Sequence, residues 1–308
     1  MPAGGESMIA LLGGLGAAFA WATSSLSSAR SSRLADPLAV VAWMMVVGLL
    51  ICTPIAAAEG LPARLHGLTW LWLALAGGGN VGGLLLTYAA YRRGLVALIT
   101  PLVSTEGAVA AVIAVLAGER LGGAALAALA LAVLGVCAAS IRPQTLVAVP
   151  TASAAAAAGA QHEPGSQGRF AHLLVVALAL TAALLFGASL YATARAGALL
   201  PAVWVVLAAR VVGSVTLALP LAFTGRLRLS RRAIPLVVTS GICEVLGFFA
   251  YTLGSRHGIA IAAVIASQFS TLVVLGSYVL FGERLGRMQL AGVCAVIAGV
   301  SLVSVVTA

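Results

Sequence analysis

The sequence contains no lysine and few charged residues of any kind. All 17 basic residues are arginines, and only 8% of the 308 residues are charged. Without lysine there is no nucleotide-binding loop of the Gly-x4-Gly-Lys type, which excludes ATP-driven transport by this chain alone. The net charge of +9 does not indicate nucleic-acid binding either, because no basic domain stands apart from the apolar runs.

Cysteine is also scarce. Cys52, Cys137, Cys243 and Cys294 each lie inside an apolar run and form no CxxC pair. Isolated thiols in such surroundings usually behave as small hydrophobic side chains. The four histidines lie at or beyond the ends of apolar runs, without metal-ligand spacing. We therefore predict no disulfide, no metal, no redox role and no cofactor.

Apolar residues make up 62% of the chain, and the mean hydropathy is +1.12. Runs of about 20 apolar residues are long enough to cross a bilayer as helices, which satisfy their own backbone groups in lipid. The sequence predicts an all-α polytopic membrane protein with ten transmembrane helices. The predicted spans are 8–29, 37–58, 68–90, 95–117, 121–141, 171–194, 201–224, 233–254, 259–281 and 286–307.

One short sequence occurs twice. Gly118–Gly122 (GERLG) returns unchanged at Gly282–Gly286, an offset of 164 residues. We predict a first five-helix repeat at 1–141, a flexible Pro-, Gly- and Ser-containing linker at 142–170, and a second five-helix repeat at 171–308. Because five is odd, the two repeats must be inverted relative to each other, and the substrate site is expected near the bilayer midplane, where they meet.

The arginines bear on orientation. Outside the spans, 12 are expected on one side of the membrane and 4 on the other, and the positive-inside rule then places both termini outside. The expected partners are the lipid bilayer and a small-molecule substrate, with a proton as a coupling ion and no nucleic acid. We expect a multi-pass protein of the bacterial inner (plasma) membrane, as a monomer or homodimer.

Only three charged residues fall deep inside the predicted spans: Glu106, Arg210 and Glu244. A charge at that depth costs at least about 2.5–3.5 kcal/mol on insertion scales, so such residues usually face a bundle interior or a water-filled path. Either glutamate can bind a proton or a cationic substrate, or can simply hydrogen-bond a neighbouring helix. Arg210 either neutralises one glutamate or binds an anionic group of the substrate.

The repeat offset pairs Asn80 with Glu244, inside two glycine-rich stretches, and Glu106 with Ser270. Two polar groups at equivalent midplane positions are typical of a site on the axis that relates the repeats. The surrounding glycines either allow close helix packing or allow local unwinding that exposes carbonyl groups to a ligand.

Aromatic and polar side chains accompany these charges. Glu244, Phe248 and Tyr251 share one helix face, where aromatic rings beside a carboxylate either hold an organic cation or form plain core. Trp21 has the same two interpretations. Gln268 and Ser270 belong to a polar patch that either lines the path or bonds to backbone one turn earlier.

The two halves resemble the EamA-type repeat of the drug/metabolite transporter superfamily. The residues that carry the resemblance are Trp21-Ala22 and Phe186-Gly187, Arg210, Pro101 and Ser104, the doubled GER-Leu turns, and Gly135 and Gly299. Trp21 and Phe186 align at an offset of 165, which places Met45 where the first repeat would carry its arginine. The resemblance implies a ten-helix metabolite transporter with cytoplasmic termini, opposite to the arginine count.

These observations predict a secondary active transporter, and favour an exporter, that moves a small organic metabolite or drug by proton exchange. One alternative is an uncoupled facilitator of a small metabolite. Another is an intramembrane lipid-handling enzyme, which the absence of a Ser/His or His/Asp constellation in the spans disfavours.

Overall fold

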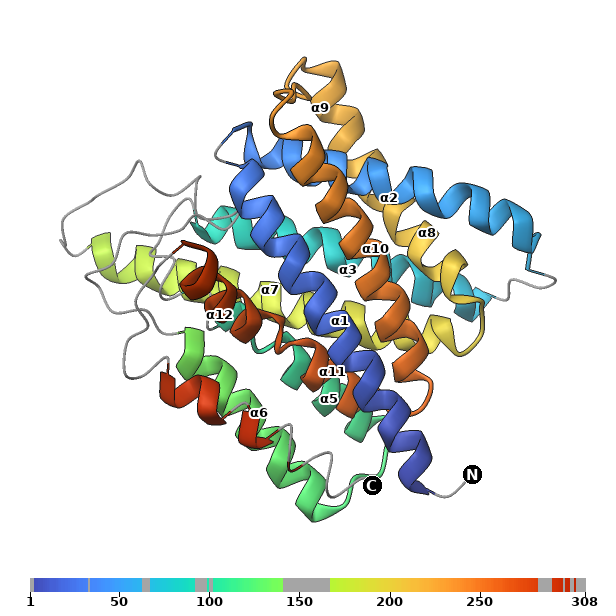
Figure 1. Cartoon of the computed structure of the whole chain (residues 1–308), viewed down its shortest axis with the longest axis vertical. Helices are drawn as coiled ribbons and strands as arrows, with labels where there is room; N and C mark the ends of the chain where they lie inside the picture. Colours follow the sequence, from blue (N-terminus) through green and yellow to red (C-terminus); the bar gives the residue numbers. More distant parts are fainter. Residues whose placement is uncertain are drawn as a thin grey trace.

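A computed structural model describes residues 3–32, 34–62, 67–91, 99, 102–140, 167–281, 290–295, 297–299 and 302, and every regular element in these segments is helical (Figure 1). The elements are α1 (Ala3–Ser31), α2 (Pro37–Glu59), α3 (Gly67–Tyr91), α5 (Glu106–Leu116), α6 (Gly123–Ser140), α7 (Gln167–Gly197), α8 (Ala202–Gly213), the π-helix η1 (Ser214–Ala218), α9 (Leu219–Phe223), α10 (Ile234–Ser255), α11 (Ile259–Ala266) and α12 (Phe269–Phe281). Most of the predicted linker and the second GERLG sequence lie outside the described residues.

In the described segments, six helices are long and apolar enough to cross a membrane: α1, α2, α3, α7, α10 and the continuous run Ala202–Phe223. Shorter apolar helical segments in the described part of the chain fall within the remaining predicted spans: Glu106–Leu116, Gly123–Gly135, α11 with the start of α12, and residues from Leu290 onward. The prediction of an all-helical membrane protein is therefore confirmed, and the count of ten spans stays a prediction.

Proline sets the local geometry of two helices. Pro37 is the first residue of α2, where its missing N–H costs nothing, and the side chain of Asp36 accepts a hydrogen bond from the Leu38 N–H at 2.9 Å. In the run from α8 to α9, Pro220 has no N–H to offer the carbonyl of Thr216, and its ring crowds that group. The helix widens to a π-helix over Ser214–Ala218 in the turn just before this proline.

Two predicted spans are interrupted at equivalent positions of the two repeats. The predicted span 259–281 is divided by a turn at Ser267 and Gln268, between α11 and α12. In the first repeat, a turn at Ser104 and Thr105 precedes α5. The offset of 164 aligns Ser104 with Gln268, so both breaks belong to the repeated architecture. Broken helices of this kind commonly surround the site of a transporter.

The two halves interlock. The first helix of each half packs along the third helix of the other, so α1 lies beside α10 and α3 lies beside α7 (Figure 1). Two further contacts join the halves: α2 packs against its own equivalent α8, and α5 packs against α11, which belongs to the equivalent span of the second repeat. Such self-paired contacts occur where an axis of pseudo-symmetry passes through a molecule, so we expect the axis to run between these helices.

Glycines allow the closest approaches, and α3 and α10 are not unwound at them. A Cβ on Gly13 would lie 2.5 Å from the Cα of Gly254, so the backbones of α1 and α10 meet there. A Cβ on Gly247 would strike the ring of Trp21, and the equivalent Gly83 faces Phe186 in the same way. For these glycines the packing interpretation holds.

Candidate functional site

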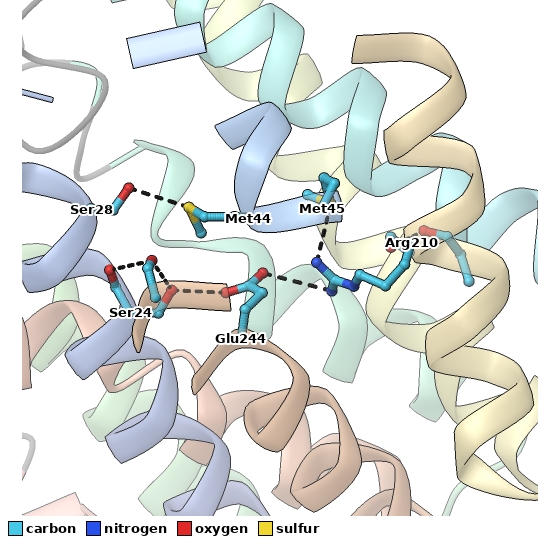
Figure 2. A network of polar contacts seen from close by, with 9 residues as sticks. Ser24, Ser28, Met44, Met45, Arg210 and Glu244 are labelled. Carbon is cyan, nitrogen blue, oxygen red and sulfur yellow. Dashed lines mark hydrogen bonds and ion pairs between the residues drawn. The ribbon is translucent and has the colours of Figure 1, made fainter. Parts of the chain in front are cut away.

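A buried ion pair lies between α8 and α10. The Nη2 atom of Arg210 is 3.8 Å from Oε1 of Glu244, and the two side chains point toward each other in Figure 2. Arg210 is fully buried, whereas the side chain of Glu244 is 18% exposed. Of the two glutamates that sequence reasoning offered to Arg210, the structure therefore selects Glu244.

Two serines hold Glu244 from the other side. Ser24 on α1 donates to Oε2 of Glu244 at 3.3 Å, and its hydroxyl lies 2.9 Å from that of Ser240 on α10 (Figure 2). Ser240 also donates to the Ser24 carbonyl at 2.9 Å. The equivalent crossing of α7 and α3 carries a similar bond, from Ser189 to the Ala76 carbonyl at 2.6 Å. Both equivalent helix crossings therefore contain a serine-to-carbonyl hydrogen bond, but a glutamate adjoins it only at the α1–α10 crossing.

Arg210 meets its own repeat equivalent. Its Nη1 donates to the sulfur of Met45 at 3.1 Å, and the offset of 165 pairs these two residues (Figure 2). Gly48 and Gly213 are also equivalents: a Cβ on Gly48 would lie 2.7 Å from Arg210 Cδ, and one on Gly213 would lie 2.7 Å from Met45 Sδ. A glycine therefore makes room for a long side chain at both equivalent positions, but that side chain is charged only in the second repeat, at Arg210.

Aromatic rings adjoin the ion pair. The guanidinium carbon of Arg210 lies 4.8 Å from the ring centre of Phe248, a cation–π distance. Trp21 is 5.1 Å from Phe248, 6.1 Å from Tyr251 and 6.3 Å from Phe269, centre to centre. The hydroxyl of Tyr251 donates to the Leu190 carbonyl on α7 at 3.0 Å. These predicted site residues form one cluster, and Phe269 joins it to the break between α11 and α12.

Glu106 occupies the other broken helix. It is the first residue of α5, is 9% exposed, and forms no ion pair with a basic side chain of the described residues. Its carboxyl lies within electrostatic range of Glu244. A Cβ on the adjacent Gly107 would lie 2.5 Å from the hydroxyl oxygen of Ser267, so the start of α5 touches the break at the end of α11.

The polar patch at that break mostly bonds to backbone. Gln268 Nε2 donates to the Val264 carbonyl at 2.9 Å, and Ser270 donates to the Ser267 carbonyl at 3.2 Å. Of the two interpretations of this patch, these bonds fit the second, in which the side chains satisfy carbonyls one turn earlier. The Oε1 atom of Gln268 nevertheless remains buried without a partner among the described residues.

Asn80 does not join the ion pair directly. It lies on α3, which packs against α8 where a Cβ on Gly77 would lie 2.9 Å from Val212. Its amide nitrogen is buried and has no hydrogen-bond partner in the described part of the chain. The pairing of Asn80 with Glu244 is therefore an equivalence of positions in the two repeats and not a contact between the two side chains.

Sequence reasoning missed several contributors, namely Ser24, Ser240, Met45, Ser214 and Phe269. Ser24 could have been found, because it lies three residues after Trp21 on the same helix face and has Ser189 as its repeat equivalent. The π-helix also had a sequence signal in Pro220. The contact between Arg210 and Met45 had none, because a sulfur atom is an unusual partner for a buried cation.

The first GERLG turn acts as a cap between the halves. Glu119 is half-buried, and its carboxyl accepts hydrogen bonds from the N–H groups of Ile259 at 3.1 Å and Ala260 at 3.2 Å, at the start of α11. Burial raises the pKa of Glu119 above its ordinary value, although these two N–H donors oppose the shift. Glu119 therefore caps the start of α11, while Arg120 is exposed.

Comparison with known proteins gives a family and a fold. The family model described as "EamA-like transporter family" matches residues 8–141 and 173–305. A search of curated proteins found no match. One solved structure, described only as "Crystal structure of protein", is 16% identical, has a TM-score of 0.75, and aligns over 97% of this chain and 98% of its own. At that identity the solved structure shows the fold alone.

Proposed function

Because the chain belongs to the EamA-like transporter family, we propose that it is a secondary active transporter of a small organic metabolite or drug. The observation that carries the proposal is a set of three charged residues where the two halves meet beside two helix breaks: Arg210 and Glu106 are buried, and Glu244 is 18% exposed. Charges that are costly to bury are retained in membrane proteins chiefly along substrate and ion pathways.

We propose alternating access, in which the two halves rock about this central region. The halves are proposed to be inverted relative to each other, so that equivalent movements open the site to opposite sides. Substrate and proton would bind at residues from both halves: Glu106, Glu244, Asn80, Arg210, Tyr251, Phe248, Gln268, Ser270 and Trp21. The expected setting is the bacterial inner membrane.

Export by proton exchange is the mode that we favour, with Glu106 as the exchanging carboxyl. Glu244 already has a cation beside it in Arg210, whereas Glu106 has none among the described residues. A buried carboxyl without a cation is stable only when protonated or when a cationic group arrives. Glu106 would release its proton as substrate binds and recover one after substrate leaves.

The proposal is tested with purified protein in liposomes. Currents or fluxes would be measured against amino acids, sugars, nucleosides and cationic dyes, with and without a pH gradient. Glu106→Gln and Glu244→Gln should each lose gradient-driven flux, whereas Glu59→Gln, at the exposed end of α2, should retain it. Full gradient-dependent flux in both buried variants would refute proton coupling and leave the uncoupled facilitator.

A further inference from the structure

The guanidinium of Arg210 is completely buried but only partly hydrogen-bonded. Its Nη1 donates to the Met45 sulfur, a weak acceptor, and its Nη2 is 3.8 Å from Glu244, beyond hydrogen-bond distance. Nε and Nη2 have no hydrogen-bond acceptor among the described residues. Buried charged donors nearly always have acceptors, so these two N–H groups indicate that a ligand completes the site.

A second unpartnered donor lies one helical turn further on. Ser214 follows Arg210 by four residues, which places both on one helix face, and its buried hydroxyl has no hydrogen-bond partner in the described segments. Ser214 is also the first residue of the π-helix. Such widened turns occur frequently at functional sites.

The neighbouring helix offers a third donor. Asn80 lies on α3, which contacts α8 through Gly77, close to Ala209 and Val212 on either side of Arg210. The amide nitrogen of Asn80 is buried and unpartnered as well. Guanidinium, hydroxyl and amide are all groups that donate to an oxygen acceptor, and the first also carries a positive charge.

We infer that Arg210, Ser214 and Asn80 form a subsite for the carboxylate of the transported metabolite. The inference rests on the proposed function and names its substrate class. Nε and Nη2 of one guanidinium form a fork that a carboxylate accepts with both oxygens. The substrate carboxylate would replace the loosely held Glu244 as the partner of Arg210, and Glu244 would take up a proton, so that one negative charge still faces Arg210, and would stay hydrogen-bonded to Ser24.

The subsite fits a carboxylate better than a phosphate. A single guanidinium faces it, and Glu244 already lies beside that guanidinium. A phosphate group brings a charge of about −1.5 to −2 at neutral pH, which one arginine cannot balance even when Glu244 is protonated. A carboxylate brings a single charge and a planar pair of oxygens.

The experiment compares acids with their own amides, which have nearly the same shape but no charge. Wild-type protein in nanodiscs, without any pH gradient, would be titrated calorimetrically with butyrate and butyramide, lactate and lactamide, and benzoate and benzamide. For at least one pair, the acid should bind about tenfold or more tightly than the amide, as expected for charge-assisted hydrogen bonds.

Variants assign that preference to the subsite. Ser214→Ala should reduce the ratio of acid to amide affinity several-fold. The double variant Arg210→Gln/Glu244→Gln should abolish it, and because it removes both charges together it leaves no charge of this pair unbalanced. Ser189→Ala is the matched control: it removes a buried hydroxyl from the α7–α3 crossing and should leave the ratio unchanged.

Equal affinities for acid and amide in every pair, no binding by any acid, or an unchanged ratio in the double variant would each overturn the carboxylate subsite. These outcomes leave the proposed function standing, because gradient-driven flux is measured separately in liposomes. Conversely, if the wild-type protein showed no gradient-driven flux, the proposed transport function would fail, but the preference for acid over amide measured in nanodiscs would still stand.

Discussion

Removing Glu244 alone should destabilise the protein more than removing both charges of its pair with Arg210. In Glu244→Gln, Arg210 stays fully buried without a carboxylate, and it keeps only a sulfur and the face of Phe248 as partners. Breaking a buried ion pair from one side typically costs about 3–5 kcal/mol. The separation of 3.8 Å is too long for a hydrogen bond, so we expect the lower end of that range, about 3 kcal/mol.

The reverse variant should cost less. In Arg210→Gln, the remaining Glu244 is 18% exposed, accepts a hydrogen bond from Ser24, and can take up a proton, so we expect about 1–2 kcal/mol. The double variant Arg210→Gln/Glu244→Gln leaves no unbalanced charge in this pair. Its cost should fall below that of Glu244→Gln alone, a coupling of at least about 1–2 kcal/mol.

The assay is reversible unfolding in mixed detergent micelles, with each unfolding free energy measured at pH 7. Glu59→Gln serves as the control for a change of glutamate to glutamine at an exposed position. Additive costs, with the double variant as unstable as the sum of the two single variants, would refute an interacting buried pair.

Three further predictions concern the scaffold and its movements. Gly13→Ala should lower the unfolding free energy by at least about 1–3 kcal/mol, because its Cβ would lie 2.5 Å from the backbone of α10. Gly78→Ala is the control and should leave the unfolding free energy unchanged, because nothing lies within 4 Å of its Cβ. Equal effects of the two variants in a denaturation series would contradict the close contact between α1 and α10. Burial raises the pKa of Glu119 only while it caps α11, so protonation of Glu119 favours the capped state. Protection of the first α11 amides against hydrogen exchange, corrected for the intrinsic exchange rate, should therefore increase as pH falls from 7 toward 4.5. Glu119→Gln should abolish that trend, and a trend of opposite sign would contradict the assignment. Cys52 is fully buried near Arg210, so in a variant that keeps this cysteine alone, maleimide labelling should be slow at rest and faster under transport conditions. An unchanged labelling rate of Cys52 during measured flux would exclude a substrate path through this region.

The sequence predicted the helices well because lipid imposes simple rules on them. The predicted span 37–58 is α2 at Pro37–Glu59, and 233–254 is α10 at Ile234–Ser255. In both cases hydropathy and a proline near the start of the helix locate the boundary. The repeat offset identified the position equivalent to Glu244, because the two repeats carry polar residues at equivalent positions as well as equivalent apolar spans.

The breaks and contacts were harder to predict. A turn at Ser267 and Gln268 leaves the hydropathy of the span unchanged, because two polar residues among many apolar ones hardly alter a window average. The partner of Arg210 depends on which helices cross, and crossing is decided by small residues such as Gly48 and Gly213 whose partners lie elsewhere in the chain. Hydropathy reports depth in the membrane but not which helix lies alongside.

The distribution of charge within the repeated scaffold limits how the protein can work. Each of the three buried charges has an uncharged equivalent: Met45 for Arg210, Asn80 for Glu244, and Ser270 for Glu106. If rocking exchanges the conformations of the two halves, the scaffold is equivalent in both states but the charges are not. The same three side chains must then serve both states, so the site is one set of residues exposed alternately to each side. That asymmetry makes the free energy of the charged set differ between the two openings, whereas the gradients of substrate and coupled proton set the direction of net transport.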